Sequence, residues 1–177
     1  MKKNIQLVKG THDIYGEDIK KFNFIVDKFY SVTNKFNFHQ VQTPIIEHQD
    51  LFTRSVGEHT DIVSKEMYSF TDKGDSTICL RPEATSSIAR LVASEYQSGS
   101  MKLSTHGPMF RRERPQKGRY RQFHQINLEN MGEKSPYLDF EIILIAYNLL
   151  NELGIDKKQF KLILNSLGSQ DDQLNYS

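Results

Sequence analysis

The chain has 177 residues, and its 23 Lys and Arg almost balance its 22 Asp and Glu. This balance argues against non-specific coating of nucleic acid, because such binding scales with the number of phosphates neutralised. A lone cysteine excludes an internal disulfide, and six scattered histidines give no metal-ligand spacing, so we expect no bound structural metal. No apolar run approaches the roughly 20 residues that cross a bilayer, and the N-terminus lacks a secretory signal. We therefore expect one globular domain in the cytoplasm, without membrane contact.

The N-terminal third predicts a helix followed by an edge strand. Apolar residues recur at helical spacing between about Glu17 and Phe36, and Asn37 suits a left-handed stop after them. The next stretch, QVQTPIIEHQDLF (40–52), is rich in β-branched residues around Pro44, which lacks the N–H that a central strand needs. We expect an interrupted edge strand there, and such an edge is a natural place for a second copy of the chain to pair.

The middle of the chain predicts a hairpin that runs directly into a helix. EMYSF and STICL are strand-like, and TDKGD between them supplies the Asp and Gly of a tight turn. A helix with Pro82 in its first turn is then expected over residues 81–96. Sites are often built at such junctions, which draws attention to Glu83 and Thr85. Glu83 also has a purely structural alternative, since the helix dipole favours a carboxylate at a helix start.

Two further strands, about 102–110 and 122–131, flank a strongly basic loop, RRERPQKGRYR. This stretch, residues 111–121, has six Lys and Arg among its eleven residues and is called the basic loop below. Arginine forks match phosphate oxygens, so arginines on opposed strands could clamp a polyphosphate. Tyr120 and Phe123 offer flat faces on which a purine could stack. The alternative is a solvated charged loop without a ligand.

The strand after the basic loop is polar where a core strand would be aliphatic. Gln125, Asn127 and Glu129 share one face by the two-residue period, together with Arg121 and Phe123. This face must meet either water or a ligand, and the residues alone leave both open.

The remaining elements are expected to be structural. A third helix is predicted from about Pro136 to Leu153, with Ser135 before it and Gly154 after it, and the segment FKLILN (160–165) predicts a strand. Cys79, between Ile78 and Leu80, is expected to be a small buried hydrophobic residue.

Several stretches together resemble one enzyme family. FRRERPQKGRYRQFHQINLE resembles motif 2 of the class II aminoacyl-tRNA synthetases, in the form found in histidyl-tRNA synthetases. KGTHDIYGED resembles the N-terminal segment of that family, residues 36–70 its motif 1 region, LRPEAT its LRPEGT signature, and LILNSLGS the stretch after its third helix. The resemblance implies an α+β fold, the class II catalytic core with an antiparallel sheet flanked by helices, here truncated. Motif 1 would span about 17–60 and motif 2 about 102–131.

The resemblance also implies a role for individual residues. Arg111 falls where the family has the catalytic arginine that bridges the amino-acid carboxylate and the ATP α-phosphate. The positions that match nucleotide contacts are Arg111, Arg119, Tyr120, Arg121 and Phe123, with Phe123 stacked on adenine. The positions that match amino-acid contacts are Glu83, Thr85 and Gln125 at the α-ammonium, Arg111 at the carboxylate and Glu129 at the imidazole. At the loop tip, tRNA contacts are expected from Arg114, Gln116 and Lys117.

The implied reaction is that of a histidine–tRNA ligase. Histidine and ATP, accompanied by Mg²⁺, would give histidyl-adenylate and pyrophosphate, followed by transfer to histidine tRNA, in a homodimer formed through motif 1. A buried carboxylate that lacks its N–H partner is costly, so Glu129 would reject amino acids that cannot donate to it. The substrate carboxylate is itself the nucleophile, so His106 and His124 are expected to be structural.

Two departures from the family qualify this expectation. Ala84 stands where glycine is common, and the insertion domain, the histidine-specific loops, motif 3 and the anticodon-binding domain are not among these residues. We therefore expect an incomplete form with little or no activity of its own. One alternative is a non-catalytic synthetase-like regulatory subunit, although such paralogues usually lose substrate-binding residues that are present here. Another is a tRNA-binding fragment, which would not explain the polar strand face.

Overall fold

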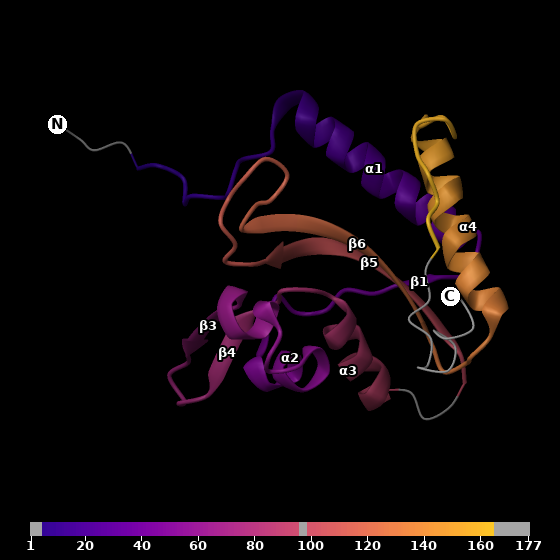
Figure 1. The fold of residues 1–177 in the computed structure, drawn as a ribbon. Helices are drawn as coiled ribbons and strands as arrows, with labels where there is room; N and C mark the ends of the chain where they lie inside the picture. Colours follow the sequence, from indigo (N-terminus) through magenta and orange to yellow (C-terminus); the bar gives the residue numbers. More distant parts are fainter. Residues whose placement is uncertain (1–4, 96–98, 165–177) are drawn as a thin grey trace, which may run out of the picture.

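The computed structural model describes residues 5–95 and 99–164, and two small sheets organise them (Figure 1). The larger sheet has the order β1 (His39–Gln40), β5 (Met101–Phe110), β6 (Gln122–Met131). The smaller has the order β2 (Ile46–His48), β4 (Thr77–Leu80), β3 (Tyr68–Thr71). All pairs are antiparallel except β1 with β5, which is parallel. The expected hairpins are confirmed, and the expected antiparallel sheet is confirmed apart from β1.

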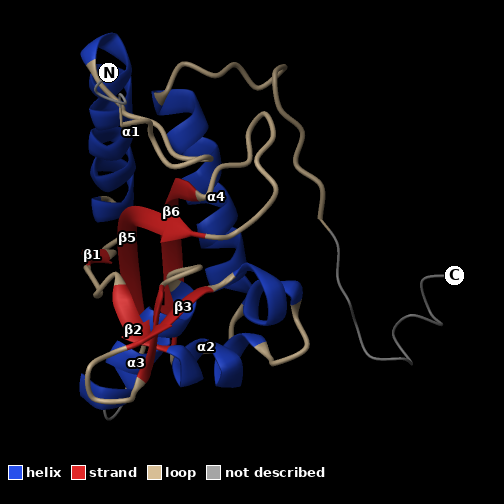
Figure 2. Cartoon of the chain, turned by 90° about the vertical axis from the view of Figure 1, so that its left-hand side faces the viewer, coloured by secondary structure: helices blue, strands red, loops and turns tan. Residues whose placement is uncertain are grey.

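The larger sheet lies between two layers. Helices α1 (Gly16–Asn34) and α4 (Pro136–Glu152) cover one face, while α2 (Gln49–Val56), α3 (Thr85–Glu95) and the smaller sheet lie on the other. Figure 2, turned by 90°, shows the same arrangement, with β5 and β6 between α1 and the α2 and α3 pair. The fold is therefore a layered α+β arrangement, as the sequence predicts.

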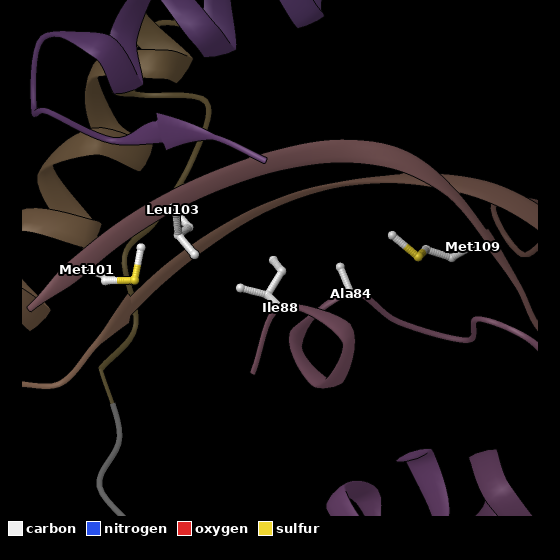
Figure 3. Close-up of a cluster of buried hydrophobic side chains, with 5 residues drawn as sticks. All are labelled: Ala84, Ile88, Met101, Leu103 and Met109. Carbon is white, nitrogen blue, oxygen red and sulfur yellow. The ribbon is translucent and has the colours of Figure 1, made fainter. Parts of the chain in front are cut away.

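Successive side chains of β5 and β6 point to opposite faces of the sheet, so these strands contribute to the packing on both faces. On the α3 side, the side chains of Met101, Leu103 and Met109 form one buried cluster with Ala84 and Ile88 (Figure 3). Burying each of the larger side chains in this cluster, the isoleucine, the leucine and the methionines, stabilises the fold by roughly 1.5–3 kcal/mol, although ordering the chain offsets much of that.

On the opposite side, a second cluster joins the helices to the sheet. Val32 of α1 and Ile145 of α4 pack with Phe38, and Leu128 of β6 lies against them. Lys28 of α1 and Lys35, which directly follows α1, also pair with Glu152 of α4, at 2.7 and 3.4 Å.

The sequence signals for the two long helices are confirmed. Ser135 accepts a hydrogen bond from the backbone N–H of Tyr137 and so caps α4, whose first residue is Pro136. Gly154 after α4 and Asn37 after α1 both have positive φ, at 78° and 61°. Within the described ranges, no helix combines the length and apolar character needed to cross a bilayer.

The edge-strand prediction for residues 40–52 is correct only in part. Gln40 ends β1 in the larger sheet, whereas residues 46–48 form β2 in the smaller one, so the chain changes sheet around Pro44. The last four residues of the stretch are helical instead, because α2 buries Phe52 completely. The β-branched run before α2 hid this helix from the sequence, and the π-helical turn η1 (Ile62–Glu66) was not predicted either.

The predicted strand FKLILN is wrong over its described residues, 160–164. These residues form no strand with any described part of the chain. Phe160 instead packs edge-on against Tyr147 of α4, with the ring centroids 5.9 Å apart, while Leu162 to Leu164 are exposed. An apolar run becomes a strand only beside a strand that can bond to it, and here the segment lies against a helix. Asn165 at the end of this segment, and Tyr96 at the end of the helix predicted over residues 81–96, lie outside the described residues.

Candidate functional site

A buried arginine ties the β4–α3 junction to the end of β5. Arg81 is only 2% exposed. Its Nε donates to the carbonyl of Pro108 at 3.0 Å, and its Nη1 donates to the carbonyl and hydroxyl of Thr43 at 2.9 and 3.0 Å. Gly107 leaves room for this guanidinium, because a Cβ there would collide with Nη2 of Arg81. Burial lowers the pKa of Arg81, yet these bonds hold the charged side chain in place.

Two carboxylates meet at the first residue of α3. Glu83 accepts from the backbone N–H groups of Thr85 (2.6 Å) and Ser86 (3.0 Å), so it caps the helix. The Thr85 hydroxyl donates to Glu129 Oε1 of β6 at 2.6 Å. We call Glu83, Thr85 and Glu129 the acidic corner. Glu83 therefore does cap the helix, which is the structural alternative that we predicted for it from the sequence.

Partial burial governs the titration of Glu129. Loss of hydration raises the pKa of the Glu129 carboxyl, and the nearby charge of Glu83 raises it further. The hydrogen bond from Thr85 acts in the opposite direction. The corner thus holds negative charge at some energetic cost.

The polar face of β6 points toward α3. Phe123 lies opposite Met109 and Glu129 opposite Leu103, and both β5 partners pack on the α3 side. Gln125 and Asn127 lie between them on the same face by the strand period. Their side-chain oxygens are buried and find no hydrogen-bond partner among the described residues. A buried polar atom without a partner is costly, which favours a ligand over a purely structural face.

Arg111 stands at the edge of this face. Its Nε donates to the carbonyl of Pro82 at 3.0 Å. Its guanidinium carbon lies 5.2 Å from the centroid of the Phe123 ring, a cation–π distance. The junction, the arginine and the aromatic ring therefore form a continuous surface beside the acidic corner.

The basic loop is anchored at its base and exposed at its tip. The backbone N–H of Arg121 donates to the carbonyl of Gly10 at 2.7 Å, and the rings of Tyr120 and His12 lie 4.7 Å apart. Gly10 has φ 87°, and a Cβ there would come within 2.8 Å of Arg121 Cγ, so glycine is required. The exposed residues of the loop are Arg112, Arg114, Gln116, Lys117, Gly118, Arg119 and Tyr120.

The structure thus divides the predicted site residues into two groups. The first lies around the α3 start: Glu83, Thr85, Arg111, Phe123, Gln125 and Glu129. The second lies in the basic loop: Arg114, Gln116, Lys117, Arg119, Tyr120 and Arg121. Tyr120 contacts His12 rather than the Phe123 face. Arg119 forms a 3.1 Å ion pair with Glu113 instead of standing free.

Two histidines, one in β5 and one in β6, lie on the face of the larger sheet that α1 covers. His106 and His124 pack around Phe22 of α1, with ring centroids 5.9 and 4.8 Å away, and the Tyr30 hydroxyl lies 3.4 Å from His106 Nδ1. Burial lowers the pKa of both imidazoles. Cys79 is fully buried, and loss of hydration raises its thiol pKa to about 11. Cys79 is thus the small buried residue that the sequence predicts, whereas His106 is half-buried and His124 stays exposed beside Phe22.

Comparison with known proteins decides the family. A sequence profile described as histidyl-tRNA synthetase matches residues 10–169. The chain belongs to the histidyl-tRNA synthetase family. The histidine–tRNA ligase of Novosphingobium aromaticivorans is 48% identical over 168 residues, which are 92% of this chain and 40% of that protein. The chloroplastic histidine–tRNA ligase of Gracilaria tenuistipitata var. liui is 46% identical, over 97% of this chain and 41% of that protein. The chain therefore spans about 40% of the length of these relatives.

Solved structures agree with this assignment. Apo histidyl-tRNA synthetase of S. aureus has a TM-score of 0.68 and 33% identity, over 83% of this chain and 34% of that one. A Bacillus halodurans protein described as an ATP phosphoribosyltransferase regulatory subunit/histidyl-tRNA synthetase has a TM-score of 0.74. Its identity of 24%, over 86% of this chain and 39% of that one, shows the fold alone. The fold of the histidyl-tRNA synthetase core that the sequence predicts is thereby confirmed.

Two residues of this histidyl-tRNA synthetase family member have structural roles that were not predicted from its sequence. Arg81 reads as an ordinary charged residue, because burial of a guanidinium by three carbonyl and hydroxyl oxygens depends on distant segments. Glu113, the partner of Arg119, did carry a signal, since it is the one acidic residue in the basic loop.

Proposed function

We propose that this protein acts in histidine–tRNA ligation. Histidine and ATP, with Mg²⁺ accompanying the nucleotide, react to histidyl-adenylate and pyrophosphate, and the histidyl group then passes to histidine tRNA. The observation that carries the proposal is the acidic corner beside Arg111, with the buried Gln125 oxygen next to it. The relatives that are 46–48% identical are named histidine–tRNA ligases, which supports the same reaction.

The acidic corner suits a ligand rich in N–H donors. Glu83 and Gln125 can accept from an α-ammonium group, and Glu129 from an imidazole N–H. A carboxylate that is already partly desolvated loses more when its ligand cannot donate to it. Selection for histidine over amino acids of similar size would therefore come from Glu129.

Arg111 is the proposed catalytic group. Adenylate formation joins a histidine carboxylate oxygen to the α-phosphorus of ATP and expels pyrophosphate. A bidentate guanidinium can hold the attacking carboxylate and stabilise the charge that develops on the α-phosphate. Its Nε is fixed by Pro82, which orients the outer nitrogens before the substrates bind. Phe123 beside it offers a stacking surface for adenine.

The outer phosphates are proposed to bind Arg119 and Arg121, with Tyr120 at the same pocket. The Arg119 side chain is 64% exposed and its pair with Glu113 is therefore weak, so exchanging that partner for a phosphate costs little. Exposed Arg114, Gln116 and Lys117 at the loop tip are proposed to touch the tRNA acceptor end.

The last part of the proposal is a homodimer formed through motif 1, at about 17–60. Motif 2, at about 102–131, then carries the nucleotide and tRNA contacts proposed above. Apolar side chains exposed in the motif 1 region support the homodimer: Phe24, Ile25, Ile45 and Ile46. Because the proposed substrate is tRNA, we also propose that the protein acts in the cytoplasm.

The direct test is histidine-dependent exchange of labelled pyrophosphate into ATP, measured in the protein at its natural length. Arg111→Ala and Glu83→Gln are expected to abolish exchange, while Arg112→Ala, an exposed arginine next to the site, retains it. Absence of exchange in the unaltered protein would refute the proposal. Binding of tRNA that falls steeply with salt but ignores ATP would then favour a tRNA-binding fragment.

A further inference from the structure

The N-terminal segment crosses the basic loop before it enters α1 (Figure 1). It makes a turn there, in which the carbonyl of Val8 accepts from both the backbone N–H and the hydroxyl of Thr11, at 3.0 and 2.8 Å. His12 follows the turn, and its ring contacts the ring of Tyr120. We call residues 8–12 the N-terminal strap. The reaction proposed above gives the strap no role.

The strap fits closely against both arms of the basic loop, residues 111–115 and 119–121. The carbonyl of Gly10 accepts from the backbone N–H of Arg121 in the second arm. A Cβ on Gly10 would lie 2.8 Å from Arg121 Cγ and 3.1 Å from Pro115 Cγ, which belongs to the first arm. Gly10 also has φ 87°, a conformation that other residues rarely adopt. The fit therefore depends on glycine at this position.

The two arms have different supports outside the hairpin of β5 and β6. In the first arm, the backbone N–H of Arg112 donates to the carbonyl of Glu66, the last residue of η1, at 2.6 Å. In the second arm, the backbone of Arg121 and the ring of Tyr120 both contact the strap. Loss of the strap would therefore release the second arm and leave the first arm anchored.

The second arm carries the side chains proposed to bind the outer phosphates. Arg119, Tyr120 and Arg121 follow one another there, and the Arg119 side chain is largely exposed. A loop that is ordered before its ligand arrives binds more tightly, because less conformational freedom is lost on binding. Contacts that fix the backbone of this arm should therefore strengthen nucleotide binding.

We propose that the strap is a positioning element for the nucleotide. Gly10 and His12 act through Arg121 and Tyr120, and hold the second arm where the outer phosphates of ATP bind. This inference rests on the proposed function. The strap itself touches neither substrate, and it makes no hydrogen bond to the acidic corner within the described part of the chain. Histidine binding is therefore independent of it.

Exchange of labelled pyrophosphate into ATP tests the inference, in the protein at its natural length and at saturating pyrophosphate. Gly10→Ala brings a methyl group against Arg121 and Pro115, so the KM for ATP is expected to rise about tenfold, as for the loss of one hydrogen bond to a charged group. The KM for histidine and kcat should change less than about twofold, because a contact made equally in the ground state and the transition state affects KM alone.

Gly16→Ala is the matched control. Gly16 also has positive φ, at 60°, but a Cβ there meets nothing within 4 Å. This variant carries the same kind of backbone strain without a collision, so its KM for ATP should stay within about twofold of the unaltered value.

Variants of His12 test the other contact of the strap. His12→Ala removes the ring that contacts Tyr120 and is expected to raise the KM for ATP about threefold, while His12→Phe keeps a ring there and should restore most of the loss. In a Tyr120→Ala background, His12→Ala should have little further effect, because its partner is already absent.

An unchanged KM for ATP in both Gly10→Ala and His12→Ala would overturn the inference. Equal rises in the KM for ATP and for histidine, or a rise as large in Gly16→Ala, would also overturn it, because either pattern indicates a general effect on the fold. If Gly10→Ala does not fold, as judged by circular dichroism, the two His12 variants decide the test. Absence of exchange in the unaltered protein would refute the proposed function, and this inference with it, so the two failures are distinguishable.

Discussion

The acidic corner and the basic loop lie close together but are built differently. Two hydrogen bonds of 2.6 Å join Thr85 to Glu83 and to Glu129, and a third, of 3.0 Å, joins Glu83 to the backbone N–H of Ser86. The basic loop is held mainly through its backbone, at Gly10 and between Gln116 and Arg119, while most of its charged side chains are exposed. The acidic corner is therefore the preorganised part of this surface, and the basic loop is the part that can adapt.

The largest effect should come from Arg81, the buried arginine that ties the β4–α3 junction to the end of β5. Arg81→Met is expected to lower the free energy of unfolding by about 3 kcal/mol or more, because it removes the donor to the buried carbonyl and hydroxyl of Thr43 and to the partly buried carbonyl of Pro108. Urea unfolding measures this loss. Arg112→Met, at an exposed arginine, is the matched control and should change stability by less than about 0.5 kcal/mol. Equal effects of the two variants would mean that Arg81 is not the anchor.

Glu129 should show opposite effects on binding and on stability. Glu129→Gln is expected to weaken histidine binding at least about tenfold, because the carboxylate acceptor is lost. It should nevertheless stabilise the fold near neutral pH. The raised pKa of Glu129 means that stability falls as pH rises from 4.5 through the folded pKa, since the unfolded state releases its proton first.

Urea unfolding across a pH series, together with calorimetry of histidine binding, checks both halves of this prediction. Glu133→Gln, at an exposed carboxylate beyond the end of β6, is a suitable control that should leave both quantities unchanged. A glutamine variant at position 129 that binds histidine normally would remove Glu129 from the proposed specificity.

The acidic corner also shows what could be predicted from the sequence. The two-residue period placed Gln125 and Glu129 on one face, and the strand-to-helix junction marked Glu83, because both signals are local. The bond between Thr85 and Glu129 joins residues 44 positions apart, and no periodicity reports such a pairing. The same limit explains α2, whose helical form depends on burial of Phe52, and the lost strand at 160–164, which lacks a neighbouring strand.

A smaller effect is expected at the histidines behind the sheet, which lie opposite the corner. Burial lowers the pKa of His124, and the charges of His106 and His12 lower it further. The unfolded state therefore binds the proton first, so stability should fall as pH drops below 6.5. His124→Phe keeps an aromatic ring against Phe22 and should make the pH dependence of urea unfolding shallower. An unchanged pH dependence would show that the packed imidazole does not limit acid stability.

The smallest effect is expected in the basic loop. The pair between Arg119 and Glu113 joins a 64% exposed side chain to one that is 19% exposed, so Glu113→Gln should change the free energy of unfolding by less than about 1 kcal/mol. Added salt should reduce even that difference, because exposed charges are screened within about 10 Å at 0.1 M salt. Urea unfolding at low and high salt measures both quantities. A loss of 2 kcal/mol or more would contradict the contrast drawn above, because the loop would then be as firmly fixed by its side chains as the acidic corner is.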